Sequence, residues 1–165
     1  MPTEMGEYLV GAYLKLLKGC HFVDYNVRPP GGGLAGLDEF DVVGFDFKNS
    51  RAYLCEVTTH VAGLLYGSGN KDTVDRIRKK FEKQQAYAET HLSRFRPEFM
   101  FWSPVVPKGR LTDELDTLAR QGLTVVINGK FKESVAELID KARREKNDTG
   151  NPAFRMLQIL GSLRD

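Results

Sequence analysis

The chain of 165 residues has little of the residue types that build zinc sites and disulfide-rich domains: two cysteines and three histidines. Cys20 and Cys55 lie far apart and without the short spacing of metal ligands. We therefore expect two reduced thiols that act as small buried hydrophobic groups, and a cytoplasmic protein.

Long hydrophobic runs are also missing. No stretch approaches the roughly 18 apolar residues of a membrane span, so we expect no membrane partner. The first residues, MPTEMGEY, are acidic and do not show the basic-then-apolar pattern of a secretion signal. The sequence has no glycine-rich nucleotide fingerprint and no nucleophile elbow, which disfavours P-loop enzymes and serine hydrolases.

The composition that remains is that of an ordinary globular domain, with 41% hydrophobic and 28% charged residues. We expect a single domain over residues 1–165. The net charge of +2 is unevenly distributed. Residues 1–60 hold five Lys/Arg and eight Asp/Glu, whereas residues 71–96 hold eight Lys/Arg and four Asp/Glu. An acidic half beside a basic segment suits a protein that binds both a cation and phosphates, although a solvated amphipathic helix would show the same pattern.

Two apolar runs, 40–47 and 52–57, flank the polar turn Lys48-Asn49-Ser50-Arg51 and predict a β-hairpin. Each run contains one acid among apolar neighbours, Asp41 in the first and Glu56 in the second. A carboxylate inside an apolar strand is costly unless it is paired, hydrogen-bonded or bound to a metal. Two acids on paired strands can converge on one divalent cation, and the alternative is a pair of structurally satisfied core carboxylates.

This arrangement of an acid in one strand, a hairpin and an acid in the next strand resembles the active-site signature of the PD-(D/E)XK nuclease superfamily. Asp41 is the first acid, and Glu56-Val57-Thr58 stands where the family has Glu-x-Lys. Glu7 matches an accessory acid that many members carry in the first helix; otherwise it is a first-turn acid favoured by the helix dipole. The resemblance covers residues 4–105, and the chain departs from it at Thr58, which has no charge.

The resemblance implies the roles of the site residues. In divergent members a lysine from the following helix replaces the missing strand lysine, and Lys80 is the candidate here; otherwise Lys80 solvates the helix flank. The metal ligands would be Asp41 and Glu56 with the main-chain carbonyl of Val57. The cation would be Mg²⁺, with Mn²⁺ as a substitute, because hard cations prefer oxygen ligands. The expected reaction is metal-dependent hydrolysis of phosphodiester bonds.

The expected partner is nucleic acid, DNA ahead of RNA. Phosphate contacts are expected from the cationic side chains Arg28, Arg76, Arg78 and Lys83. A homodimer contact is a further expectation, because the apolar tail 152–163 must either cover the core or pair with another chain.

Periodicity predicts helices at 4–18, 70–92, 111–120, 131–144 and 152–163, and strands at 21–28, 40–47, 52–57, 98–103 and 123–127. This order predicts an α/β protein with three α/β/α layers and a central mixed sheet, as the restriction-endonuclease-like resemblance also implies. Two other functions stay open. One is a catalytically inactive relative that binds nucleic acid or a protein partner, which Thr58 favours. The other is a different α/β enzyme that uses the same acids.

Overall fold

The computed structural model describes residues 2–29, 39–63 and 69–163. Its centre is a five-stranded sheet in the order β1-β2-β3-β4-β5, formed by β1 (Phe22–Val27), β2 (Phe40–Asp46), β3 (Arg51–Val57), β4 (Arg96–Ser103) and β5 (Leu123–Ile127). The first three strands pair antiparallel, whereas β3, β4 and β5 run parallel. The sheet is therefore mixed.

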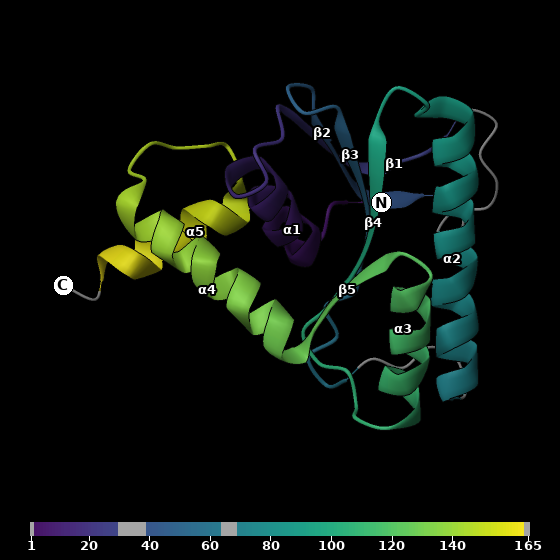
Figure 1. Ribbon diagram of the computed structural model, residues 1–165. Coiled ribbons are helices and arrows are strands. Elements are labelled where there is room, and N and C mark those ends of the chain that lie inside the picture. Colours follow the sequence, from purple (N-terminus) through teal and green to yellow (C-terminus); the bar gives the residue numbers. More distant parts are fainter. Residues whose placement is uncertain (1, 30–38, 64–68, 164–165) are drawn as a thin grey trace.

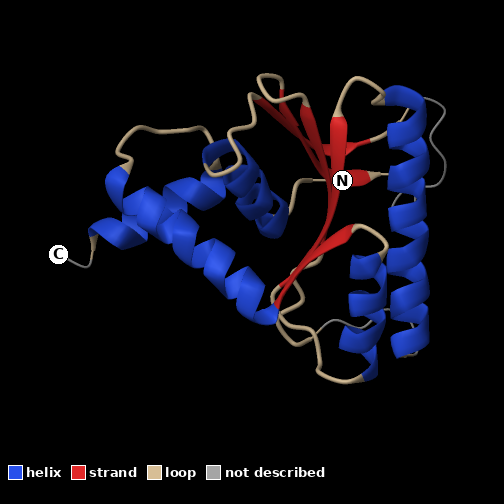
Figure 2. Ribbon diagram, viewed as in Figure 1, coloured by secondary structure: helices blue, strands red, loops and turns tan. Residues whose placement is uncertain are grey.

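Helices cover both faces of this sheet (Figures 1 and 2). One face carries α2 (Asn70–His91) and α3 (Arg110–Arg120), which make the crossovers between the parallel strands. The other face carries α1 (Met5–Leu16), α4 (Asn128–Arg144) and α5 (Pro152–Ser162). The expected three-layer α/β/α architecture with a central mixed sheet is confirmed at this level.

The apolar stripe of α2 explains why this helix lies flat on the sheet. Val74, Ile77, Phe81 and Ala88 recur at helical spacing and are all buried. They pack with Leu54 and Phe101 of the central strands and with the α3 leucines. The opposite layer is built in the same way around α1, whose Val10 and Leu14 pack on β2, β3 and β4.

The hairpin formed by β2 and β3 agrees with its prediction, and its register pairs Val42 with Cys55 and Asp46 with Arg51. Element bounds differ from expectation by only a few residues. The largest shift is in α4, which begins at Asn128, three residues before the expected start. Residues 30–38 and 64–68 lie outside the described residues.

The tail helix α5 packs against α1 and α4 through Phe154 and Leu157. Its outer side chains Met156, Ile159, Leu160 and Leu163 are exposed. The tail therefore covers part of the core, which was one of the two expectations. The other, a contact with a second copy of the chain, stays a prediction. In the part of the chain that the structure describes, no helix has the length and apolar character needed to cross a membrane.

Candidate active site

A cleft of about 380 Å³ opens where β3 ends and β2 begins. It is lined mainly by charged and polar groups from α1, β2, β3, α2 and the segment after β3: Glu4, Glu7, Glu39, Asp41, Glu56, Val57, Thr58, Thr59, His60, Arg76 and Lys80. Five carboxylates therefore face two Lys/Arg side chains, and this excess of negative charge favours the binding of a cation.

Asp41 and Glu56 meet because of the hairpin register. Val42 pairs with Cys55, and continuing the register by one residue sets Asp41 opposite Glu56. The two carboxyl groups share a hydrogen bond. Asp41 Oδ2 also accepts a hydrogen bond of 2.7 Å from the backbone N–H of Val57. The two acids singled out in the sequence therefore come together, and both have polar partners.

Lys80 reaches the same point from α2. Its Nζ donates to Glu56 Oε1, and the side chain is only 12% exposed. Lys80 therefore turns inward from the border of the apolar stripe rather than solvating the helix flank. Its neighbour Lys79 is exposed.

Burial sets the protonation of the two carboxyl groups, Glu56 and Asp41. Desolvation, reinforced by repulsion from Asp41, raises the pKa of Glu56 to about 8, and the lysine beside it lowers the value by less. Burial also raises the pKa of Asp41, against the opposing effects of Lys80 and of the Val57 N–H. Lys80 therefore does not keep both carboxyls ionised, and near pH 7 the pair holds a proton.

Glu7 approaches from the first turn of α1, and its Oε2 accepts hydrogen bonds from the Glu4 backbone N–H (2.9 Å) and from Asn26 Nδ2 (3.2 Å). The bond to Glu4 has the form of a helix capping box, so Glu7 has a structural role as well. Desolvation is the main effect that raises its pKa, with a smaller contribution from the charge of Asp41.

Asn26 is a site residue that the sequence analysis missed. It lies near the end of β1 with φ +52°, a left-handed conformation that is uncommon for any residue other than glycine. Its side chain bonds both Glu7 and Thr3 and so joins β1 to the start of α1. Strained backbone of this kind gathers at functional sites. An asparagine near a strand end is the only trace of it in the sequence.

Close packing of α1 on the segment after β3 fixes where Glu7 lies. A Cβ atom on Gly6 would be 2.1 Å from Thr59 Cγ2, so only glycine fits there without a shift. Thr58, which stands at the family's lysine position, is 4% exposed and donates its backbone N–H to the Trp102 carbonyl. The register between β3 and β4 therefore continues one residue past β3 and holds Thr58 at the cleft.

Glu39 and Arg28 form an ion pair of 3.5 Å at the cleft, where Glu39 is buried. Glu39 is a cleft residue that the sequence analysis did not select, and its partner Arg28 is 11 residues away in the chain. The pairing also engages Arg28, which was expected to contact phosphate.

The other three residues expected to contact phosphate all lie on α2, but only one of them lines the cleft. Arg76 lines the cleft beside Lys80. Arg78 instead faces α3, where it pairs with Asp75 (3.1 Å) and Glu114 (3.7 Å). Lys83 is exposed on α2 and is not among the side chains that line the cleft. The structure thus brings together Glu7, Asp41, Glu56, Arg76 and Lys80 with Val57 and Thr58, and it leaves Arg78 and Lys83 outside the cleft.

The fit to a metal ion rests on two carboxylates. Across the described ranges, no group of three or more His, Cys, Asp and Glu side chains is arranged to hold a metal ion. Mg²⁺ is commonly held in proteins by one or two carboxylates, with water and substrate oxygens completing the shell. Asp41 and Glu56, side by side in an open acidic cleft, fit that kind of site.

Comparison with known proteins found no relative of this chain. No protein-family model matches the chain, and neither curated protein sequences nor solved structures give a significant match. The functional argument therefore rests on the residues of the cleft.

Proposed function

We propose that the protein is a metal-dependent nuclease that hydrolyses phosphodiester bonds of nucleic acid, DNA ahead of RNA. The observation that carries the proposal is the convergence of Asp41, Glu56 and Lys80 from three different elements in one open cleft. Asp41 and Glu56 would be the metal ligands, with the Val57 carbonyl beside them and Glu7 in support.

The electrostatics of the cleft support a catalytic role over a purely structural one. Burial keeps the pKa values of Glu7, Asp41 and Glu56 raised, so holding these groups together opposes folding as the pH rises. A cluster of apolar side chains at the same place would not lose stability in this way as the pH rises. Carboxyls with raised pKa values grouped in a cleft are typical of functional sites.

Each residue has a definite task in this proposal. Mg²⁺, when bound, would lower the pKa of a water molecule and stabilise negative charge on the phosphate. Lys80 would hold the attacking water and balance charge on the phosphate, in place of a lysine at position 58. Arg76 would contact a neighbouring phosphate from the same wall of the cleft.

The order of elements through β4 supports a restriction-endonuclease-like fold, because α1, three strands, α2 and β4 follow one another as that resemblance requires. Within this proposal Asp41 and Glu56, opposite each other at the open end of the β2–β3 hairpin, occupy the positions that such enzymes use for their ligands. No separate recognition domain is needed, since Arg76 and Lys80 already lie on one helix beside the ligands.

The test is cleavage of plasmid DNA, single-stranded DNA and RNA in Mg²⁺, Mn²⁺ or EDTA. Asp41→Asn and Glu56→Gln keep the side-chain shape and remove the charges, and Glu82→Gln, on the exposed side of α2, is the matched control. Metal-dependent cutting that survives Glu82→Gln and is lost in both cleft variants supports the proposal. Cutting that persists in both cleft variants, or in EDTA, contradicts it.

A second function has one residue in its favour. Thr58 stands where the family has its strand lysine, and a threonine carries no charge. That departure suits a relative that keeps the fold and binds nucleic acid or a protein without cutting. Absence of cation binding together with absence of cleavage would select this alternative.

A further inference from the structure

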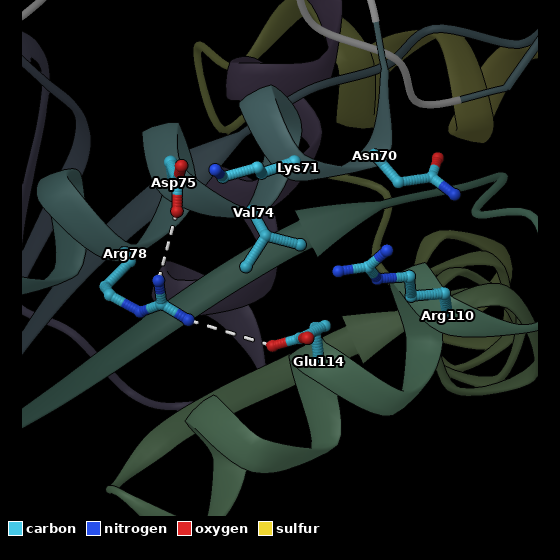
Figure 3. A pocket seen from close by; sticks show the side chains of 7 residues that line it. All are labelled: Asn70, Lys71, Val74, Asp75, Arg78, Arg110 and Glu114. Atoms are coloured by element: carbon cyan, nitrogen blue, oxygen red, sulfur yellow. Dashed lines mark hydrogen bonds and ion pairs between the residues drawn. The ribbon is translucent and has the colours of Figure 1, made fainter.

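A second cavity, of about 170 Å³, lies between α2 and α3, away from the side chains of the cleft. Figure 3 shows its lining. The lining residues come from the starts of the two helices: Asn70, Lys71, Val74, Asp75 and Arg78 from α2, and Arg110 and Glu114 from α3. Three cations and two carboxylates therefore surround a floor that Val74 makes apolar.

The two carboxylates of this cavity share one guanidinium. Arg78 bonds Asp75 through Nη1 (3.1 Å) and pairs with Glu114 through Nη2 (3.7 Å), so one guanidinium lies between both acids (Figure 3). Arg78 was expected to contact phosphate, and its two acidic partners give it a different task. It offsets one of the two negative charges that would repel an anion, and Lys71 and Arg110 bring the lining to a net charge of +1.

Lys71 and Arg110 remain as the cations available to a ligand. Both are exposed, and within residues 2–29, 39–63 and 69–163 neither forms an ion pair. In Figure 3 the Arg110 guanidinium points toward Val74. A guanidinium and an ammonium beside one small cavity match a phosphate, which accepts hydrogen bonds on several oxygens at once.

The position of the cavity relates it to the cleft. Arg76 lines the cleft, and Lys71 lines the cavity five residues earlier on the same helix. That spacing is about 7.5 Å along the axis and roughly 140° around it. The first two turns of α2 therefore present cations on both flanks, one toward the cleft and the other toward α3.

We propose that the cavity between α2 and α3 is a phosphate-contact site, where Lys71 and Arg110 hold the backbone of a nucleic acid that leaves the cleft across the start of α2. The inference rests on the proposed function in one respect, namely that the ligand of the cleft is a nucleic acid. It adds a route for the strand, and it reassigns Arg78 from ligand contact to charge balance.

The experiment measures binding without cleavage. A fluorescein-labelled 16-nucleotide single strand of DNA and its duplex are titrated with protein in EDTA at 50 to 200 mM NaCl, and anisotropy gives the affinity. The test variant is the double substitution Lys71→Gln with Arg110→Gln. The control is Arg120→Gln with Lys132→Gln, which removes the same charge from exposed positions elsewhere. Thermal unfolding of each variant checks that the fold is kept.

We expect the Lys71/Arg110 variant to bind about tenfold or more weakly than the control. The slope of log affinity against log salt should become shallower by roughly 1.4 for the single strand or 1.8 for the duplex, because two phosphate contacts are lost. Equal affinities and equal slopes for the two variants would overturn the inference.

Failure of the proposed function has a different signature. If the protein binds but does not cut, all variants are inactive in Mg²⁺, while the Lys71/Arg110 variant still binds more weakly than its control. If the protein cuts but the cavity has no such role, the two variants bind alike and cut alike.

Discussion

Lys80 on α2 and Glu56 on β3, 24 residues apart in the chain, form an ion pair inside the cleft. The pair connects the helical layer to the strand that carries the candidate ligands. It also places a cation beside two carboxyls, Glu56 and Asp41, that share a hydrogen bond. The protonation of these three groups is therefore linked, and the first three predictions follow from that linkage.

Replacing Lys80 by Ala should reduce cleavage by about 10² to 10³-fold, as expected when one stabilising charge is removed from a preorganised site. The loss of stability should be small near pH 7, because Glu56, with its pKa raised to about 8, can remain protonated without its partner. Cleavage rates and urea unfolding measure the two effects. Lys79→Ala, at the exposed neighbouring position, is the control. Equal losses of activity in both variants would remove the special role of Lys80.

Stability should fall as the pH rises from about 4.5 to about 8. The pKa of Glu56 is near 4.5 in the unfolded chain and about 8 in the folded protein, so in this window the folded state keeps a proton that the unfolded state has lost. The slope should reach about 1.4 kcal/mol per pH unit for one such group. Below this window the stability from the proton is fully present, and above it that stability is gone.

Glu56→Gln removes the titration, since the amide keeps the shape and stays neutral. The variant should match the wild type near pH 4 and be more stable near pH 9, and Glu82→Gln should follow the wild type throughout. Urea unfolding at each pH gives the comparison. A wild type whose stability rises across the window would show that Glu56 is ionised in the folded protein.

Binding of Mg²⁺ should release about one proton per ion near pH 7, because a carboxyl must ionise before it can act as a ligand. The number should decline toward zero above pH 9, and affinity should increase with pH up to about 8. Calorimetry in two buffers of different ionisation enthalpy counts the protons. Glu56→Gln should bind more weakly and release none, whereas proton release that survives this substitution would assign the titration to another group.

Gly6→Ala should destabilise the protein by about 1 to 3 kcal/mol, because the new methyl group would meet Thr59 Cγ2 at 2.1 Å and push α1 away from the end of β3. Gly129→Ala in α4 is the control, since a Cβ there meets nothing within 4 Å, and the same change should stabilise by about 0.5 to 1 kcal/mol. Combining Gly6→Ala with Thr59→Ala should restore part of the loss. Additive losses in the double variant would exclude this contact as the cause.

Much of the fold was predictable, because periodicity reports directly on burial. Val74, Ile77, Phe81 and Ala88 indicated the buried stripe of α2, and the structure buries all four. Asp41 and Glu56 could be selected because each interrupts an apolar strand, where a carboxylate needs a partner. The inward turn of Lys80 was inferred only through the resemblance, since its place on the border of the stripe allows either direction.

The details that were missed depend on partners far away in the chain. Only the residue type hints at the positive φ of Asn26, and nothing local marks its bond to Glu7, which follows from how β1 meets α1. The ion pair between Arg78 and Glu114 likewise forms only because α3 packs on α2. Such pairings are set by the tertiary fold, and the hydrophobic periodicity of the sequence does not indicate them.

Cys55 adjoins Glu56 in β3, and its side chain is completely buried, with a thiol pKa raised well above the usual value by desolvation. The side chain packs beneath α1 with Val10 and Leu14, so a thiol reagent can reach the sulfur only when α1 lifts from this face of the sheet or β3 itself opens. The rate of its chemical labelling therefore measures how often the structure around this strand opens. A cation held by Glu56 with Glu7 of α1 in support should lower that rate.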